Sequence, residues 1–155
     1  MAQNNNQRRS LILTSASHNS ATTNFIDKNA AVMQGWKKEG NIANIFLSIR
    51  FVQKDFECFS EWQKDEMGLF WDFNDRIHQS TWTQVYAQSG KTDKSGLAIT
   101  PIKKSQYPHN DFVKKLSQDV DLFELRVSQK IRVHGFRDGA ILYLCFLDRN
   151  HKICP

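Results

Sequence analysis

The sequence predicts an α+β domain, and three observations support that fold class. Residues 122–127, 130–137 and 140–147 are rich in β-branched and aromatic side chains that alternate with polar ones, a pattern typical of antiparallel strands. An apolar stripe at helical spacing precedes them, and the apolar run from Ile45 to Val52 predicts a strand before that stripe. The expected order is β-α-α-β-β-β, with a C-terminal antiparallel meander and the helices packed on one face of the sheet.

Two helices are expected between the first strand and the meander. Ser60 and Gln63 resemble a capping box, and Ser80 is placed to cap a second, short helix. The stripe of the first helix consists of Phe59, Trp62, Phe70, Phe73 and Ile77, and the second helix contains Trp82, Val85 and Tyr86. Glycines and prolines predict a loop over 89–108, and a short helical turn is expected over 110–116.

Two tight connections join the strands of the meander. Ser128-Gln129 links the first strand to the second. Asp138-Gly139 predicts a two-residue hairpin of type I′, because that turn needs a positive φ at both positions.

Length and composition indicate one globular domain with a polar extension. The chain has 155 residues, of which 40% are hydrophobic. Residues 1–40 are rich in Asn, Ser, Thr and Ala and predict a flexible extension, which leaves the α+β domain at 41–155. The sequence shows neither a membrane-spanning run nor the apolar stretch of a signal peptide, so we expect a cytoplasmic protein with no membrane partner.

Charge and cysteine content limit which classes of partner and cofactor fit this sequence. The net charge of +5 is compatible with a polyanion such as nucleic acid. Cys58, Cys145 and Cys154 fit no zinc pattern, and Cys145 is expected to be a small core residue. The histidines lack metal-ligand spacing, so no metal and no cofactor are expected. The segment Ser89–Thr92 resembles the end of a P-loop, but the first glycine of that motif is missing.

Strand alternation places the candidate functional residues on one face of the meander. We expect one face of these strands to pack on the core through Phe123, Leu125, Val127, Ile131 and Val133. We therefore expect Arg126, Arg132 and His134 to stand together on the opposite, open face, with further cations at the strand ends. Guanidinium groups bind phosphate, and histidine transfers protons near neutral pH. RNA cleavage through the 2′-hydroxyl of the RNA needs only these groups.

A structural interpretation of the same residues stays open. Charged side chains on a sheet face commonly form cross-strand pairs, and Glu124 could pair with Arg132. His134 could be a packed or solvated histidine. His151 could be a turn residue bonded to Asp148.

The meander resembles the RelE/HigB-like toxins of bacterial toxin–antitoxin modules. The resemblance lies in Phe123–Val127, in Ile131–Phe136, in the apolar segment Ile141–Leu147 and in the basic ending Arg149–Lys152. It implies a RelE-like fold and metal-free cleavage of mRNA, either free or on the ribosome, with a cognate antitoxin as partner. Arg126 and Arg132 match the strand arginines with which that family grips the phosphate.

Together these arguments predict a metal-independent endoribonuclease toxin. The expected catalytic residues are Arg126, Arg132, His134 and His151, and the expected nucleic-acid-binding residues are Lys130, Arg137, Arg149 and Lys152. The alternative is a binder without catalysis on the same fold, either a toxin of the gyrase-inhibitor type or a module of a defence system.

Overall fold

The computed structural model describes residues 40–89, 96–108 and 111–155. The predicted flexible extension over 1–40 lies outside the described residues, apart from Gly40. The strands are β1 (Phe46–Ser48), β2 (Thr100–Pro101), β3 (Phe123–Arg126), β4 (Arg132–Asp138) and β5 (Ile141–Asp148). The α-helices are α3 (Lys64–His78), α4 (Trp82–Ala87) and α5 (Asp111–Lys115), and two 3₁₀ turns, η1 and η2, span Phe59–Glu61 and Lys104–Gln106.

The strands form one mixed sheet in the order β1-β5-β4-β3-β2. Strand β1 is parallel to β5, and the other pairs are antiparallel. The α+β class and the C-terminal meander are therefore confirmed. The predicted first strand, 45–52, is shorter than expected, and the short edge strand β2 lies within the predicted loop. No helix in the described part of the chain is long and apolar enough to cross a membrane.

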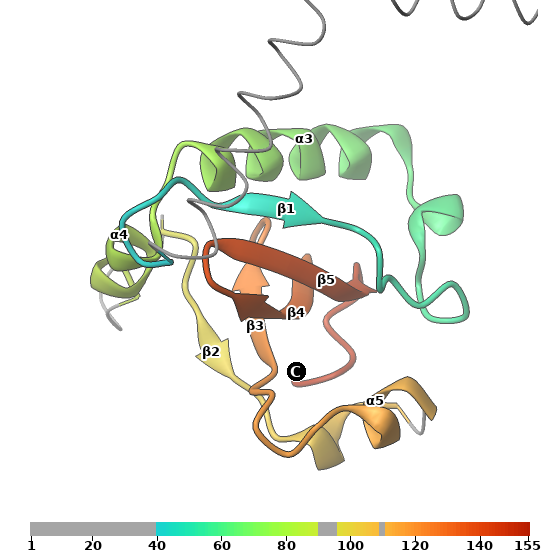
Figure 1. Cartoon of the computed structure of the whole chain (residues 1–155). Coiled ribbons are helices and arrows are strands. Elements are labelled where there is room, and N and C mark those ends of the chain that lie inside the picture. Colours follow the sequence, from blue (N-terminus) through green and yellow to red (C-terminus); the bar gives the residue numbers. More distant parts are fainter. Residues whose placement is uncertain (1–39, 90–95, 109–110) are drawn as a thin grey trace, which may run out of the picture. The chain divides into compact units, whose positions relative to one another are not determined.

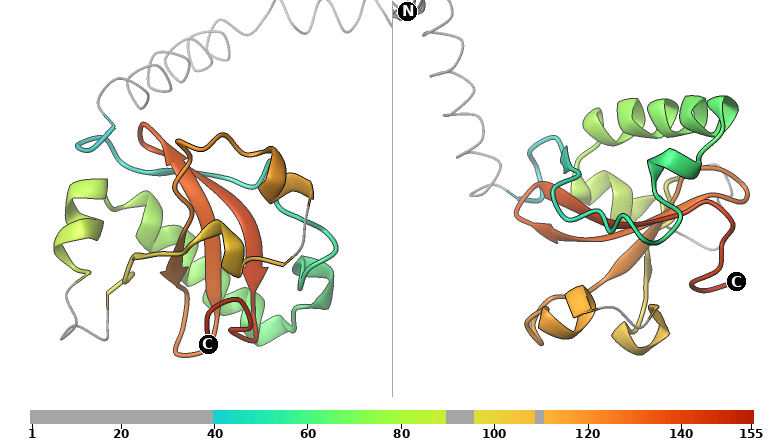
Figure 2. Two further views of the ribbon diagram at one scale, coloured as in Figure 1. Left: turned by 90° about the horizontal axis from the view of Figure 1, so that it is seen from below. Right: turned by 90° about the vertical axis from the view of Figure 1, so that its right-hand side faces the viewer.

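Both faces of the sheet are covered, as Figures 1 and 2 show. Helices α3 and α4 pack on one face and enclose a core that includes Phe73, Trp82 and Leu125. Turn η2, helix α5 and the C-terminal tail lie on the other side, over a second core that contains Tyr107 and Phe146. The prediction that all helices pack on one face is therefore wrong for α5, because strands β4 and β5 present apolar side chains in both directions.

Helix α3 begins one turn later than the sequence suggested. Its N-cap is Gln63, and the Glu66 carboxylate accepts a hydrogen bond from the Gln63 backbone N–H at 2.7 Å. Ser60 lies in η1 instead. The predicted stripe is confirmed within the helix, where Phe70, Phe73 and Ile77 are the buried residues. Burying side chains of this size contributes roughly 1.5–3 kcal/mol each and holds the helix on the sheet.

Helix α4 is capped by Thr81 rather than by Ser80. The Thr81 hydroxyl accepts from the Gln84 backbone N–H at 3.3 Å, and the Gln84 side-chain oxygen accepts from the Thr81 N–H at 2.8 Å. These reciprocal bonds make a capping box. Ser80 instead donates to the carbonyl of Arg76 and so ends the preceding helix.

The β4–β5 turn is shifted by one residue from the prediction. Asp138 pairs with Ile141 as part of the ladder, so the two-residue loop is Gly139-Ala140. Gly139 has φ 60°, and Ala140 is not among the residues with a positive φ. A positive φ at the first loop position alone fits a type II′ turn rather than type I′.

A β-bulge in β5 shapes the sheet beside the candidate site. His134 pairs with Phe146 and Gly135 pairs with Leu144, so Cys145 is an extra residue on β5. A Cβ at Gly135 would lie 2.0 Å from the Tyr143 carbonyl oxygen, so the close approach of the strands requires glycine there. The bulge turns both Cys145 and Phe146 into the second core. Cys145 is thus a small core residue, as predicted, and burial raises the pKa of its thiol to about 12.

Candidate functional site

The register of β3 and β4 sets two arginines against each other. Arg126 lies directly opposite Arg132, and Glu124 lies opposite His134. Directly opposed side chains project from the same face, so the prediction that Arg126, Arg132 and His134 share a face is confirmed. Like charges at directly opposed positions destabilise a sheet unless an anion compensates them.

The guanidinium of Arg132 is held by the turn that joins the two strands. Its Nη1 donates to the backbone carbonyl oxygens of Ser128, Gln129 and Ile131, at 2.9, 3.3 and 3.1 Å. Arg132 is only 8% exposed. Burial, and to a smaller extent the charge of Arg126, lowers the pKa of Arg132 from its ordinary value. The charge is therefore partly desolvated and fixed in place, which strengthens its attraction for an anion.

A cavity of about 500 Å³ opens beside these two residues. We call it the arginine cavity; its lining residues are Arg76, Gly96, Arg126, Val127, Ser128, Gln129 and Arg132. Arg76 comes from the last turn of α3, and its Nη2 donates to the Val127 carbonyl at 3.2 Å. No sequence pattern pointed to Arg76, because it is one of several charged residues on a surface helix and its contact lies 51 positions away in the chain.

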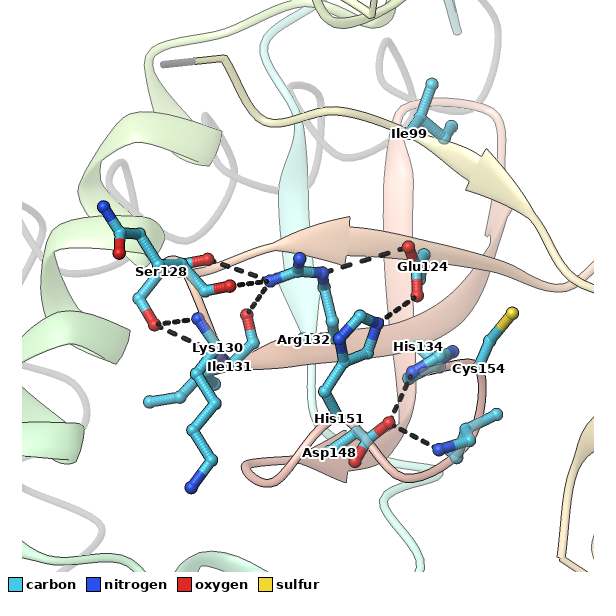
Figure 3. Close-up of polar contacts among 12 residues, drawn as sticks. Ile99, Glu124, Ser128, Lys130, Ile131, Arg132, His134, Asp148, His151 and Cys154 are labelled. Carbon is cyan, nitrogen blue, oxygen red and sulfur yellow. Dashed lines mark hydrogen bonds and ion pairs between the residues drawn. The ribbon is translucent and has the colours of Figure 1, made fainter. Parts of the chain in front are cut away.

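Glu124 lies between Arg132 and His151, as Figure 3 shows. Its Oε1 is 3.9 Å from Nε of Arg132, and its Oε2 is 3.8 Å from Nε2 of His151. Among the described residues, neither Oε2 of Glu124 nor Nε2 of His151 has a hydrogen-bond partner. The predicted pairing of Glu124 with Arg132 is therefore present as a long ion pair. The His151 imidazole belongs to the same charged cluster.

His134 is a buried residue rather than an open one. Its side chain is completely inaccessible, with Nδ1 3.2 Å from the Tyr107 hydroxyl and Nε2 3.4 Å from the Asp148 carboxylate. The Nε2 atom faces the carboxylate without forming a hydrogen bond among the described residues, so the Tyr107 hydroxyl is the hydrogen-bond partner of this ring. Burial raises the pKa of Tyr107 well above its ordinary value, so the hydroxyl keeps its proton. The expectation that the face is open at His134 is wrong, because Tyr107 and the C-terminal tail cover it.

Asp148 fixes the tail that carries His151. Its two carboxylate oxygens accept from the backbone N–H groups of Lys152 and Ile153, at 2.7 and 2.9 Å. Burial opposes the charge of Asp148, but the contact with His134 and the hydrogen bonds from these two N–H groups prevail and lower its pKa. His151 has φ 54° and its N–H meets the Asp148 carbonyl, so it is also the turn residue that the structural interpretation foresaw.

Two cations predicted to bind nucleic acid are engaged in ion pairs. Arg149 binds the Glu66 carboxylate through Nε and Nη2, at 3.1 and 2.9 Å. The Lys152 ammonium lies 2.7 Å from Oε1 of Glu57, whose buried carboxylate also accepts from Asn150. Burial opposes the charge of Glu57, yet the bonds from Lys152 and Asn150 lower its pKa overall. These contacts attach the tail to the first turn of α3 and to the segment between β1 and α3.

Of the remaining two predicted cations, one lies beside the candidate site and the other lies away from it. Lys130 is exposed in the β3–β4 turn, which also lines the arginine cavity. Arg137 is five positions along β4 from Arg132, or about 16 Å in an extended strand. It packs over the ring of Trp82 at 4.9 Å and donates to Asn41 and to the Gly139 carbonyl. The structure therefore does not bring Arg137 to the arginine cavity.

The site is thus a cationic cavity at the turn end of the β3–β4 hairpin, with a histidine and a glutamate at its side. Within the described ranges, no group of three or more His, Cys, Asp or Glu residues could hold a metal ion. Comparison with protein-family models, with curated proteins and with solved structures found no match to this chain. Fold and site together define a small α+β protein with an arginine-lined cavity.

Proposed function

We propose that this protein is a metal-independent endoribonuclease toxin of the RelE/HigB-like kind, which binds mRNA at the arginine cavity and cleaves it. One observation carries the proposal: arginines from α3, β3 and β4 line a single cavity. Three convergent guanidinium groups suit the phosphodiester backbone of RNA, which is anionic at every linkage. The resemblance of β3 and β4 to that toxin family adds support.

The charge balance of the site favours an anionic ligand. Arg76, Arg126 and Arg132 contribute three positive charges to the cavity wall, and Glu124 is the carboxylate that lies against Arg132. A phosphate between the arginines would reduce the repulsion between the opposed Arg126 and Arg132. Arg132 is held by three carbonyl oxygens before any ligand arrives, so it loses little freedom on binding.

The proposed reaction uses the 2′-hydroxyl of the RNA as nucleophile. The 2′-oxygen attacks phosphorus and the bond from phosphorus to the 5′-oxygen breaks, which leaves a 2′,3′-cyclic phosphate and a 5′-hydroxyl. One proton leaves the 2′-oxygen and one is gained by the 5′-oxygen. In this proposal His151 accepts the first proton, with the Glu124 carboxylate 3.8 Å from its ring, and water supplies the second. The arginines stabilise the charge that develops on the phosphate.

The other predicted residues take different roles in this proposal. His134 acts through Tyr107 and Asp148 to hold the tail and so positions His151. Lys130 contacts the RNA backbone beside the cavity. Arg149 and Lys152 fix the tail, and Arg137 stabilises the hairpin. A cognate antitoxin with acidic side chains would cover the arginine cavity.

The test is RNA cleavage by the full chain in the presence of EDTA. A defined RNA should give fragments ending in a 2′,3′-cyclic phosphate, and replacement of one nucleotide by its 2′-deoxy form should protect that linkage. Arg126→Gln should reduce cleavage at least tenfold and reduce the salt slope of RNA binding by about 0.7, the value for one lost contact to a single strand. Arg50→Gln, at an exposed position on the loop after β1, is the matched control. Equal losses in the two variants would refute the proposal.

A binder without catalysis is the second candidate, and the burial of His134 favours it. With that ring enclosed between Tyr107 and Asp148, His151 is the one predicted proton carrier left at the surface. Induction of His151→Ala in cells separates the two candidates. Loss of toxicity with retained RNA binding supports the nuclease. Growth arrest equal to that of the unchanged chain, with intact transcripts, supports the binder.

A further inference from the structure

A second cavity adjoins the arginine cavity. Its volume is about 320 Å³, within the size range of small-ligand pockets. We call it the glutamine cavity; it is lined by Arg76, Gln79, Ser80, Gln84, Gln88, Gly96 and Leu97. Arg76 and Gly96 also line the arginine cavity, so the two cavities share a wall.

The lining of the glutamine cavity is amide-rich, whereas its neighbour is cationic. Gln79 and Gln88 follow the last turns of α3 and α4, where their backbone N–H groups bond to the carbonyls of Asp75 and Gln84. Within the described residues, no hydrogen bond involves the side-chain amide of Gln79 or Gln88. The side-chain oxygen of Gln84 is taken by Thr81, which leaves its NH₂ group as a donor. Leu97 is 3% exposed and supplies an apolar wall.

Amides beside an apolar wall match the edge and the face of a nucleobase. A glutamine amide both donates and accepts, and its best-fitting partner is adenine, which offers an acceptor at N7 and a donor at N6. The bases of single-stranded RNA can be turned outward to meet such groups, whereas those of a duplex are stacked and paired. A cavity of this kind next to an arginine-lined phosphate site has the layout of a nucleotide subsite.

We propose that the glutamine cavity binds the base next to the phosphate held in the arginine cavity, and that it selects adenosine in single-stranded RNA. The proposal rests on the proposed function, because it takes the arginine cavity as the phosphate site. Arg76 contributes to both, since its guanidinium lies at the shared wall. Gln79 and Gln88 read the base, while Gln84 adds one donor and caps α4.

The test measures binding of the full chain to four pentanucleotides of sequence UUNUU, where N is each of the four bases. UUAUU should bind roughly 5- to 150-fold more tightly than the other three, the range expected for one bidentate contact to a base. In the double variant Gln79→Leu/Gln88→Leu the four affinities should become equal, while the salt dependence of binding stays. Gln118→Leu, an exposed position beyond α5, is the matched control and should keep the preference for adenosine.

The outcomes separate this inference from the function on which it rests. Salt-dependent binding of all four oligonucleotides with equal affinity by the unchanged chain overturns the base subsite and leaves the phosphate site standing. A preference for adenosine that survives in the double variant also overturns the subsite. If no pentanucleotide binds even at low salt, both the subsite and the proposed function are wrong.

Discussion

Removal of a single oxygen, in Tyr107→Phe, tests whether His134 is a structural residue. Tyr107 is 6% exposed and His134 is fully buried, and the Tyr107 hydroxyl lies 3.2 Å from Nδ1 of the His134 ring. The variant keeps the aromatic ring but leaves the buried nitrogen without a partner. An unsatisfied buried polar group costs about 1–3 kcal/mol.

The free energy of unfolding should therefore fall by about 2 kcal/mol, which lowers Tm by roughly 5–15 °C in a domain of this size. Urea denaturation followed by tryptophan fluorescence measures the change, and an unaltered slope shows that the folded and unfolded states keep their compactness. Tyr86→Phe is the matched control, because Tyr86 is 48% exposed and its hydroxyl is 3.4 Å from Arg137. A surface change of this kind costs less than about 0.5 kcal/mol.

The Tyr107→Phe variant also distinguishes a structural role of His134 from a catalytic one. If His134 only supports the tail, RNA cleavage per folded Tyr107→Phe molecule should stay within about twofold at a temperature where the variant is folded. A stability equal to that of the unchanged chain, combined with a large loss of cleavage, would refute the reasoning, because the ring would then serve the reaction and not the fold.

Three further changes probe other contacts. Gly135→Ala should destabilise the fold by more than about 2 kcal/mol, seen in the urea midpoint, because the new Cβ would lie 2.0 Å from the Tyr143 carbonyl oxygen. A double-mutant cycle with Arg149→Ala and Glu66→Ala should give a coupling of about 1 kcal/mol, because the pair is bidentate and mostly buried; additive losses would contradict it. The free energy of unfolding, measured from pH 7 to pH 3, should fall as the pH is lowered, because folding lowers the pKa values of Glu57 and Asp148. The stability that these carboxylates contribute is complete above their ordinary pKa values of 4.5 and 3.8 and is lost as the pH falls below them. Asp148→Asn should make this loss of stability smaller.

The meander could be predicted closely from the sequence. Strands expected at 122–127, 130–137 and 140–147 are observed at Phe123–Arg126, Arg132–Asp138 and Ile141–Asp148. The reason is physical: alternation has a period of two, and one face of these strands packs on α3 and α4, so a register error would expose the core residues. The same alternation placed Arg126, Arg132 and His134 on one face.

The cover over that face could not be predicted. Alternation sorts side chains between two faces but does not say which loop lies on either face. Tyr107 reaches His134 from a segment 27 positions earlier in the chain, and the tail returns beneath β5 because Asp148 binds the N–H groups of Lys152 and Ile153. The bulge at Cys145 could not be predicted either, because it breaks the period of two on which the strand prediction rested.

The direct opposition of Arg126 and Arg132 in the sheet is the observation that best supports an anionic ligand. Directly opposed like charges cost up to about 1 kcal/mol, and burial of Arg132 adds to that. Glu124 forms a long ion pair with Arg132, at 3.9 Å, which lies beyond hydrogen-bond distance. In the proposed function, a phosphate that binds among Arg126, Arg132 and Arg76 would offset the repulsion between the two opposed arginines.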